Sequence, residues 1–290
     1  MMRKALWITF GIVLAAGCGK KSKMIQNKGS DTMINLAQAL AEEYRKVAPG
    51  VAIAVSGGGT GVGIASLQNG TVDIANASRE MKDAEKANAK KTSGKDAVEH
   101  KIGYDALAIY VHKNNPLQKI TQAQLACIYG KEGTCTKWTD LGVEVPGCSG
   151  QEIVRAGRQN NSGTYAYFRE WTLGEGKDFK LGSRDMSGSK DVVDLVAHTP
   201  CAIGYSGMGY KNDEVRWVCL SREDSEACVE PSLQAALSGA YKLSRPLYMI
   251  TNGEPTGDVA AYLAWVRSDA GQVIVERTGY APLPADQRHK

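Results

Sequence analysis

Aromatic residues and a strong charge imbalance are both lacking in this sequence. Aromatic side chains make up 7% of the 290 residues, which leaves little material for a surface that stacks nucleic-acid bases. The formal net charge is +4, from 35 basic and 31 acidic residues, without a long block of lysine and arginine. Such a small positive net charge helps to attract an anion but does not indicate nucleic acid as a partner.

Common metal-binding and catalytic motifs are missing as well. The cysteines and histidines show no Cys-x-x-Cys or Cys-x-x-His spacing, which argues against a zinc site. The glycine-rich stretches match neither a P-loop nor the Gly-x-Gly-x-x-Gly fingerprint. The segment Gly204–Met208 fails to match Gly-x-Ser-x-Gly because it ends in methionine. We therefore expect no metal, no cofactor and no enzymatic activity.

The longest apolar run stands at the N-terminus and is short for a transmembrane helix. Ala5–Ala16 is about a dozen residues long and follows a short basic segment, as in an export signal. It leads into Leu14-Ala-Ala-Gly-Cys18, which resembles a bacterial lipobox. By that resemblance, residues 1–18 are a lipoprotein signal peptide, Cys18 carries the lipid, and residues 19–24 form a polar tether. The alternative is a plain secretory signal peptide, and in both cases the body of the protein leaves the cytoplasm.

Six cysteines follow the leader. An even number in an exported chain favours disulfide bonds, and six cysteines allow fifteen pairings. Two pairs are close in sequence and would close small loops, and the third pair takes the remaining two cysteines. The expected disulfides are Cys127–Cys135, Cys219–Cys228 and Cys148–Cys201.

Strand and helix patterns alternate along the body of the chain. The unbroken apolar run Val51–Val55 predicts a buried strand, and the periodic stretches Ile34–Tyr44 and Asp258–Val266 predict helices. This alternation indicates an α/β fold with a mainly parallel sheet. Such sheets bind ligands at the sharp turns between the carboxyl end of a strand and the next helix.

Four of these turns carry groups that suit a tetrahedral oxyanion. In Arg158–Thr164, a cation and three amides lead into Ser-Gly-Thr at the start of an expected helix. A guanidinium, hydroxyls and free backbone N–H groups would converge there. The other turns are Ser30–Thr32, the glycine-rich Ser56–Gly61 and Ser78-Arg79. Each alone is also explained by an ordinary helix cap or a solvated helix start, but together they favour a two-sided anion clamp.

The order and spacing of these and other stretches resemble one family. The stretches are Gly29–Met33, Ser56–Gly61, Val72–Arg79, Arg158 with Ser162–Thr164, Ala202–Tyr205, Leu243–Tyr248 and Gly279–Leu283. Together they resemble the substrate-binding protein of the bacterial phosphate ABC transporter, the Pst type. The resemblance runs from about Ile25 to Pro284, which is nearly the whole mature chain.

The resemblance implies an α/β, two-lobed type II periplasmic-binding-protein fold. Two strands cross between the lobes as a hinge, and we expect the crossings near Leu107–His112 and Cys201–Met208. The expected division assigns residues 25–107 and 209–290 to the first lobe and residues 108–208 to the second.

The resemblance also implies a function and a set of binding residues. We expect a monomeric, lipid-anchored protein of the periplasm or cell surface that captures inorganic phosphate and delivers it to an ABC permease in the inner membrane. The phosphate-binding residues expected by this resemblance are Ser30, Asp31, Thr32, Gly59, Thr60, Ser78 and Arg79 in the first lobe and Arg158, Ser162, Gly163 and Thr164 in the second.

One position departs from the family's pattern. Well-known members carry an aspartate at the position of Arg79. A carboxylate accepts the proton that monohydrogen phosphate carries and sulfate lacks, and so separates the two anions. In this sequence Asp31 is the best replacement acceptor, because it stands beside Ser30 and Thr32. Its other explanation is a plain helix cap.

Other functions stay open at this point. The same fold could bind sulfate, molybdate or another tetrahedral oxyanion, or could sense phosphate rather than transport it. A secreted phosphatase would use Ser162 or Ser206, but the sequence marks no general base for it. An adhesin or scaffold lipoprotein without a ligand is the remaining alternative.

Overall fold

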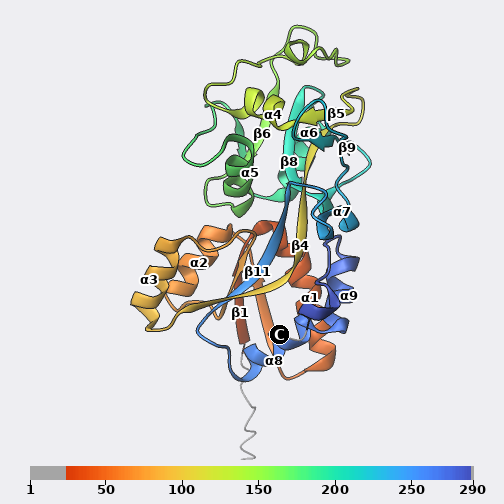
Figure 1. Ribbon diagram of the computed structural model, residues 1–290. Coiled ribbons are helices and arrows are strands. Elements are labelled where there is room, and N and C mark those ends of the chain that lie inside the picture. The colour runs from red at the N-terminus through yellow and green to blue at the C-terminus, as the bar shows by residue number, and fades with distance from the viewer. Residues whose placement is uncertain (1–23, 289–290) are drawn as a thin grey trace, which may run out of the picture.

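The computed structural model describes residues 24–288, which form two stacked α/β lobes (Figure 1). The strands are β1 (Met24–Gly29), β2 (Ala52–Ser56), β3 (Ile74–Ala77), β4 (Ala97–His112), β5 (Lys119–Thr121), β6 (Val154–Arg158), β7 (Arg184–Met186), β8 (Ala202–Gly207), β9 (Val215–Trp217), β10 (Cys219–Ser221) and β11 (Ser244–Asn252). The α-helices are α1 (Ile34–Val47), α2 (Thr60–Gln68), α3 (Asp83–Ser93), α4 (Gln122–Tyr129), α5 (Gly163–Leu173), α6 (Ser189–Ala197), α7 (Leu233–Leu237), α8 (Gly257–Arg267) and α9 (Asp269–Arg277). We call the lobe built on β1, β2 and β3 lobe one, and the lobe built on β6, β7 and β8 lobe two.

A mixed sheet runs through both lobes. Within the described residues, the sheet has nine strands: eight follow the order β2-β1-β3-β11-β4-β8-β6-β7, and the ninth, β9, pairs with β4. The pairs β1–β2 and β1–β3 in lobe one and β6–β7 and β6–β8 in lobe two are parallel, as the alternating pattern predicts. The antiparallel pairs involve β4 and β11. The predicted two-lobed α/β architecture is confirmed.

Strand β4 belongs to both lobes. Its residues Ala97–Ala106 pair with β11, and its residues Leu107–Val111 pair with β8. Figure 1 shows it rising from the lower lobe into the upper one. Strand β4 thus changes partner at Leu107, the first residue of the crossing predicted at Leu107–His112.

The return crossing differs from the prediction. Strand β8 stays in lobe two, β9 pairs with the upper end of β4, and β10 pairs with β5. The side chains of Val218, Tyr241 and Leu243 then join the hydrophobic core of lobe two. The chain therefore returns through β11 rather than near Cys201–Met208. We propose amended limits, in which residues 209–243 belong to lobe two although the sequence assigned them to the first lobe.

The core of lobe two holds the elements that carry the Arg158–Thr164 turn. Phe168 of α5 stacks on Tyr205 of β8 with ring centroids 3.8 Å apart, and Tyr129 packs edge-on against both rings. The Tyr205 hydroxyl also accepts a hydrogen bond from the backbone N–H of Arg158, at 3.3 Å. These contacts fix the end of β6 relative to the start of α5.

The core of lobe one holds the elements next to the turn after β1. The buried face of α1, which includes Leu36 and Tyr44, packs into the hydrophobic cluster of this lobe, as its period predicts. The 3₁₀ turn η1 (Asp31–Met33) precedes α1. The hydroxyls of Tyr210 and Tyr280 both donate to the backbone carbonyl of Thr32. The turn is thus held from two sides.

Three disulfides tie lobe two together. They are Cys127–Cys135, Cys148–Cys201 and Cys219–Cys228, the three pairs that the sequence predicts. Cys18 lies outside the described residues. Within residues 24–288, no helix is long and apolar enough to span a bilayer. The same residues contain no group of three or more His, Cys, Asp or Glu side chains arranged to hold a metal ion.

Loop length makes the disulfides unequal. Cys148 and Cys201 are 53 residues apart, whereas Cys127 and Cys135 are 8 apart. Loop-closure entropy then predicts that replacing Cys148 and Cys201 with alanine lowers the free energy of unfolding by about 4 kcal/mol, against about 2.5 kcal/mol for the other pair. Urea unfolding of the two double variants measures the difference. Equal losses would contradict the entropic account.

Candidate functional site

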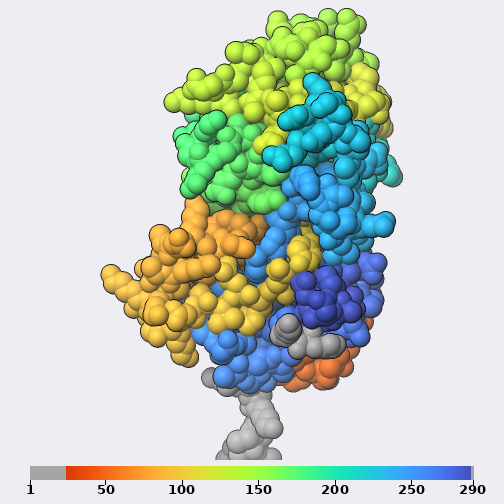
Figure 2. Space-filling model, in the orientation of Figure 1, coloured from red at the N-terminus to blue at the C-terminus, as the bar shows by residue number. Residues whose placement is uncertain are grey.

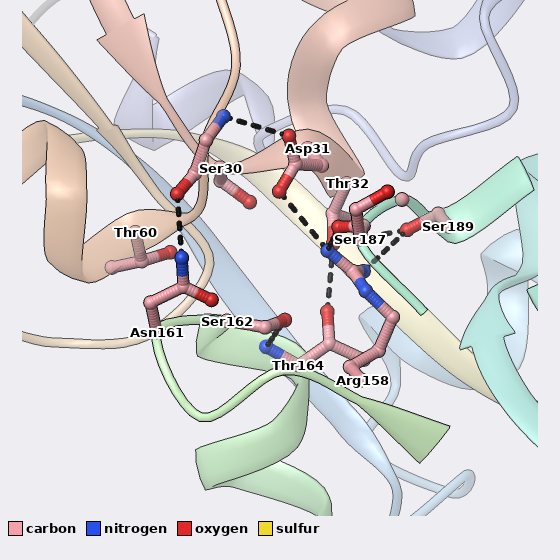
Figure 3. A network of polar contacts seen from close by, with 12 residues as sticks. Ser30, Asp31, Thr32, Thr60, Arg158, Asn161, Ser162, Thr164, Ser187 and Ser189 are labelled. Atoms are coloured by element: carbon pink, nitrogen blue, oxygen red, sulfur yellow. Dashed lines mark hydrogen bonds and ion pairs between the residues drawn. The ribbon is translucent and has the colours of Figure 1, made fainter. Parts of the chain in front are cut away.

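The four predicted turns meet between the lobes (Figure 3). Three of them follow β1, β2 and β3 of lobe one, and the fourth joins β6 to α5 in lobe two. Thr32 Oγ1 lies 2.7 Å from Thr164 Oγ1, although the two residues are 132 positions apart. Helix starts from both lobes therefore face one another, as expected for a ligand site at the carboxyl ends of strands.

Hydroxyl groups form the centre of this region. Ser30 Oγ donates to Ser78 Oγ at 2.9 Å, and Thr60 Oγ1 lies 3.4 Å from the same Ser78 oxygen. All three side chains are buried. A Cβ atom on Gly163 would lie 2.5 Å from Thr60 Oγ1 and 2.6 Å from Ser78 Oγ. Glycine at the start of α5 thus lets lobe two approach the hydroxyls of lobe one.

Arg158 is the cation at this meeting point. Its side chain is fully buried. Nη1 donates to Ser189 Oγ at 2.9 Å, and Nη2 donates to Ser187 O at 2.8 Å and to Asp31 Oδ2 at 3.1 Å. Nε donates to Met186 O at 3.3 Å. Burial lowers the pKa of Arg158, and the neighbouring Asp31 raises it. The ion pair with Asp31 joins the lobes.

Asp31 makes contacts that a helix cap does not. Its Oδ1 accepts the backbone N–H of Gly58 at 2.8 Å, while its Oδ2 faces Arg158. The carboxylate therefore links the glycine-rich turn of lobe one to the cation of lobe two. Its role in reading a proton stays a prediction.

Ser162 and Gly59 shape the site in other ways. Ser162 Oγ caps α5 by accepting the backbone N–H groups of Thr164 and Tyr165, at 3.1 and 3.4 Å. Gly59 has a φ of 92°, and a Cβ there would lie 2.8 Å from the carbonyl oxygen of Asn161. Only glycine suits this positive φ and this close approach.

Asn161 is a contact residue that the sequence did not reveal. Its Nδ2 donates to Gly58 O at 2.9 Å, and its carbonyl accepts the N–H of Gly61 at 3.0 Å. In Figure 2 the green surface of lobe two rests on the orange surface of lobe one. The glycine-rich turn therefore serves the contact between lobes.

The structure does not bring Arg79 into the site. Its guanidinium forms a two-pronged pair with Glu85 of α3, with both N–O distances at 2.8 Å, and also donates to Glu80 O. A planar guanidinium matches a carboxylate in this geometry. The Arg79 guanidinium is therefore engaged by Glu85 rather than by the hydroxyl cluster, contrary to its predicted place at the site.

Arg245 was missed from the sequence and lies inside the site. It is 1% exposed, and its Nη2 donates to Thr164 Oγ1 at 2.7 Å and to Thr32 Oγ1 at 3.4 Å. Asp105, on β4, accepts from the same nitrogen at 2.9 Å. Burial raises the pKa of Asp105, while attraction to Arg245 opposes the rise. An arginine directly before the mainly apolar stretch Pro246–Ile250 of β11 was the available signal.

The set of groups suits binding rather than reaction. Ser162 Oγ is engaged with backbone N–H groups rather than with a general base, so it lacks the arrangement of an activated nucleophile. Hydroxyls and guanidinium groups instead offer hydrogen-bond donors from two sides. That arrangement fits an oxyanion.

Comparisons with known proteins agree with this geometry. A family model described as "PBP superfamily domain" matches residues 15–270. The chain is 36% identical over 276 residues to the "Phosphate-binding protein PstS" of Pseudomonas aeruginosa. The aligned region covers 92% of this chain and 85% of that protein.

Two solved structures are similar over their whole length. One is a putative phosphate ABC transporter substrate-binding protein with bound phosphate from Clostridium perfringens, with a TM-score of 0.79 and 27% identity. The other is an ABC-type phosphate transport receptor from Vibrio cholerae, with a TM-score of 0.70 and 25% identity. Each match covers 90% of this chain and 100% of the other.

The close approach at Gly163 can be tested without a ligand. Alanine fits the helix, so we expect Gly163→Ala to keep the free energy of unfolding within about 1 kcal/mol of the wild type. Its Cβ would lie 2.5 and 2.6 Å from the hydroxyl oxygens of Thr60 and Ser78, so we expect the lobes to move apart. Small-angle scattering should show a larger radius of gyration. Gly50→Ala, which meets nothing within 4 Å, is the control, and an unchanged radius for Gly163→Ala would refute the contact.

Proposed function

We propose that this chain captures inorganic phosphate between its lobes and delivers it to an ABC permease. The chain belongs to the PBP superfamily and, within it, to the substrate-binding proteins that bind phosphate. Members of this family are substrate-binding proteins of phosphate transporters, not enzymes. The observation that carries the proposal is the meeting of buried hydroxyls and the buried guanidinium of Arg158 between the lobes.

Phosphate must recover its lost hydration inside the protein. A buried dianion needs many hydrogen bonds, and charge-assisted bonds to a guanidinium are the strongest of these. The hydroxyls of Ser30, Thr32, Thr60, Ser78 and Thr164 now bond mainly to one another, to a guanidinium or to backbone N–H. A hydroxyl rotates freely about its C–O bond. These groups can therefore turn toward an oxyanion that enters between them.

Entry of phosphate requires the lobes to separate. The hydroxyl cluster is buried, and Asn161 fastens the loop before α5 to the glycine-rich turn. The connecting strands β4 and β11 are the natural hinge, since a few residues in such connections absorb the motion. Opening and closing about them would admit and then enclose the anion.

The binding set that we propose follows from these positions. It keeps all the predicted residues except Arg79, with Gly59 and Ser162 in shaping roles. The residues that face the anion in this proposal are Ser30, Asp31, Thr32, Thr60, Ser78, Arg158, Gly163 and Thr164.

The protein acts outside the cytoplasm, as other substrate-binding proteins of this family do. We further propose that Cys18 is lipidated, that residues 19–24 tether the lobes to a membrane, and that the protein acts as a monomer. The lipobox-like sequence before Cys18 supports the anchor.

Calorimetry on the purified protein tests the function. We expect phosphate and arsenate to bind with micromolar or tighter affinity and sulfate much more weakly. Phosphate at 100 times its dissociation constant should stabilise the fold by about 2.7 kcal/mol. Arg158→Ala should weaken phosphate binding about 30-fold or more, because a buried charge-assisted bond is lost.

Arg79→Ala is the matched control, since its partner is Glu85 outside the site, and it should bind phosphate as the wild type does. Asp31→Asn should narrow the gap between phosphate and sulfate. Absence of phosphate binding by the wild type would refute the function, and equal wild-type affinity for both anions would refute the role of Asp31 alone.

The anchor can be tested by cell fractionation. We expect the wild type in the membrane fraction and Cys18→Ser in the soluble exported fraction or retained as an unprocessed precursor, since a lipobox cysteine is the site of lipidation. Cys18→Ser found in the membrane fraction with a cleaved leader would contradict the anchor.

A further inference from the structure

Two buried guanidinium groups flank the hydroxyl cluster, but their donors are not equally occupied. All three side-chain nitrogens of Arg158 have protein acceptors. In Arg245, Nη2 and Nε have acceptors, whereas the buried Nη1 has no hydrogen-bond partner among the described residues. The unused donor therefore belongs to Arg245, whose other terminal nitrogen contacts Thr32 and Thr164.

An unused donor on a buried cation is costly. Leaving a buried donor unpaired loses its hydration without replacement, and the loss is greater for a charged group. The side chain is nevertheless well held. Asp105 accepts from Nε at 3.3 Å and from Nη2 at 2.9 Å, and the Tyr167 ring centroid lies 5.5 Å from Cζ. The structure thus keeps a cation at this position in spite of the open donor.

A continuous line of polar contacts joins the two arginines. Arg158 Nη1 donates to Ser189 Oγ, which lies 3.5 Å from Thr32 Oγ1. Thr32 Oγ1 is 2.7 Å from Thr164 Oγ1, which accepts from Arg245 at 2.7 Å. Arg245 therefore contacts the threonine pair directly, and Arg158 is linked to it through Ser189.

The charges around this line also call for an anion. Burial lowers the pKa of Arg158, Asp31 and then Tyr205 raise it, and repulsion by Arg245 lowers it further. The two guanidinium groups are thus close enough to repel each other. A tetrahedral anion between them replaces repulsion with attraction and has enough oxygens to meet both.

We propose that Arg245 is a second phosphate-binding cation of this site and that Asp105 is its positioning residue. The inference rests on the proposed function. Nη1 donates to the anion, and Nη2 exchanges its contact with the threonine hydroxyls for one with a phosphate oxygen. Asp105 keeps the guanidinium plane directed at the threonine pair.

The geometry of Arg245 also suits the hinge. It stands on β11, where the chain returns to lobe one, and donates to a hydroxyl of each lobe. Asp105 stands on β4, the other connecting strand, and its paired residue across the sheet is Arg245. Anion binding at Arg245 is thus placed at the point about which the lobes would move.

The experiment compares phosphate affinities by calorimetry on the full-length protein. Removing Arg245 alone leaves Asp105 buried without its partner, so the test uses the double variant Asp105→Asn/Arg245→Gln beside Arg245→Lys. We expect the double variant to bind phosphate about ten-fold or more weakly. Arg245→Lys should recover part of the loss, because the charge remains.

Urea unfolding without phosphate separates a binding role from a structural one. The inference requires affinity to fall in the double variant more than its ligand-free stability explains, while Arg79→Gln binds as the wild type does. Wild-type phosphate affinity in a folded double variant would overturn the inference and leave the proposed function intact. If Arg245→Lys bound phosphate as weakly as the double variant, the inference would also be overturned, because keeping the positive charge would then have no effect on affinity. Failure of the wild type to bind phosphate would overturn the proposed function itself.

Discussion

A buried charge must find its partners within the protein, and this requirement organises the region between the lobes. Arg158 is fully buried, and its acceptors come from its own lobe and, through Asp31, from the other. Arg245 is almost as buried and is matched by Asp105 on the neighbouring strand. Isolated charges would be costly in such surroundings. The lobes therefore meet with their charges paired and their hydroxyls in contact, in an arrangement that an oxyanion can enter by exchange of hydrogen bonds.

The fold brings these groups together through a simple rule of α/β sheets. The helix starts after β1 and β2, the loop after β3 and the start of α5 lie at the carboxyl ends of parallel strands, and the two sets of ends face one another across the connecting strands. Small residues permit the approach, since Gly163 stands against Thr60 and Ser78 with no room for a Cβ atom. Aromatic packing behind α5 and the tyrosine hydroxyls on Thr32 hold the two sides in place.

The departure at Arg79 has a local cause. Glu85 stands in the first turn of α3 and accepts two hydrogen bonds from the Arg79 guanidinium. The additional cation of the site comes instead from β11, far away in the sequence. Glycines that looked like a ligand cradle also have a second use, because Gly59 and Gly61 receive Asn161 from the opposite lobe. One turn thus serves both the closure of the lobes and the shape of the site.

The sequence by itself determined the features that depend on short-range pattern. The strand–helix alternation, the serine-capped start of α5 at Ser162–Thr164, and two disulfides between near neighbours can all be read within a few residues, because backbone and capping chemistry act at that range. Only the tertiary structure decided the rest: that Arg79 turns to Glu85, that Arg245 and Asn161 reach the site, and that the chain returns through β11. The strength of an interaction between charges depends on their distance in space. For charges that are far apart in the sequence, that distance is set only when the lobes have folded.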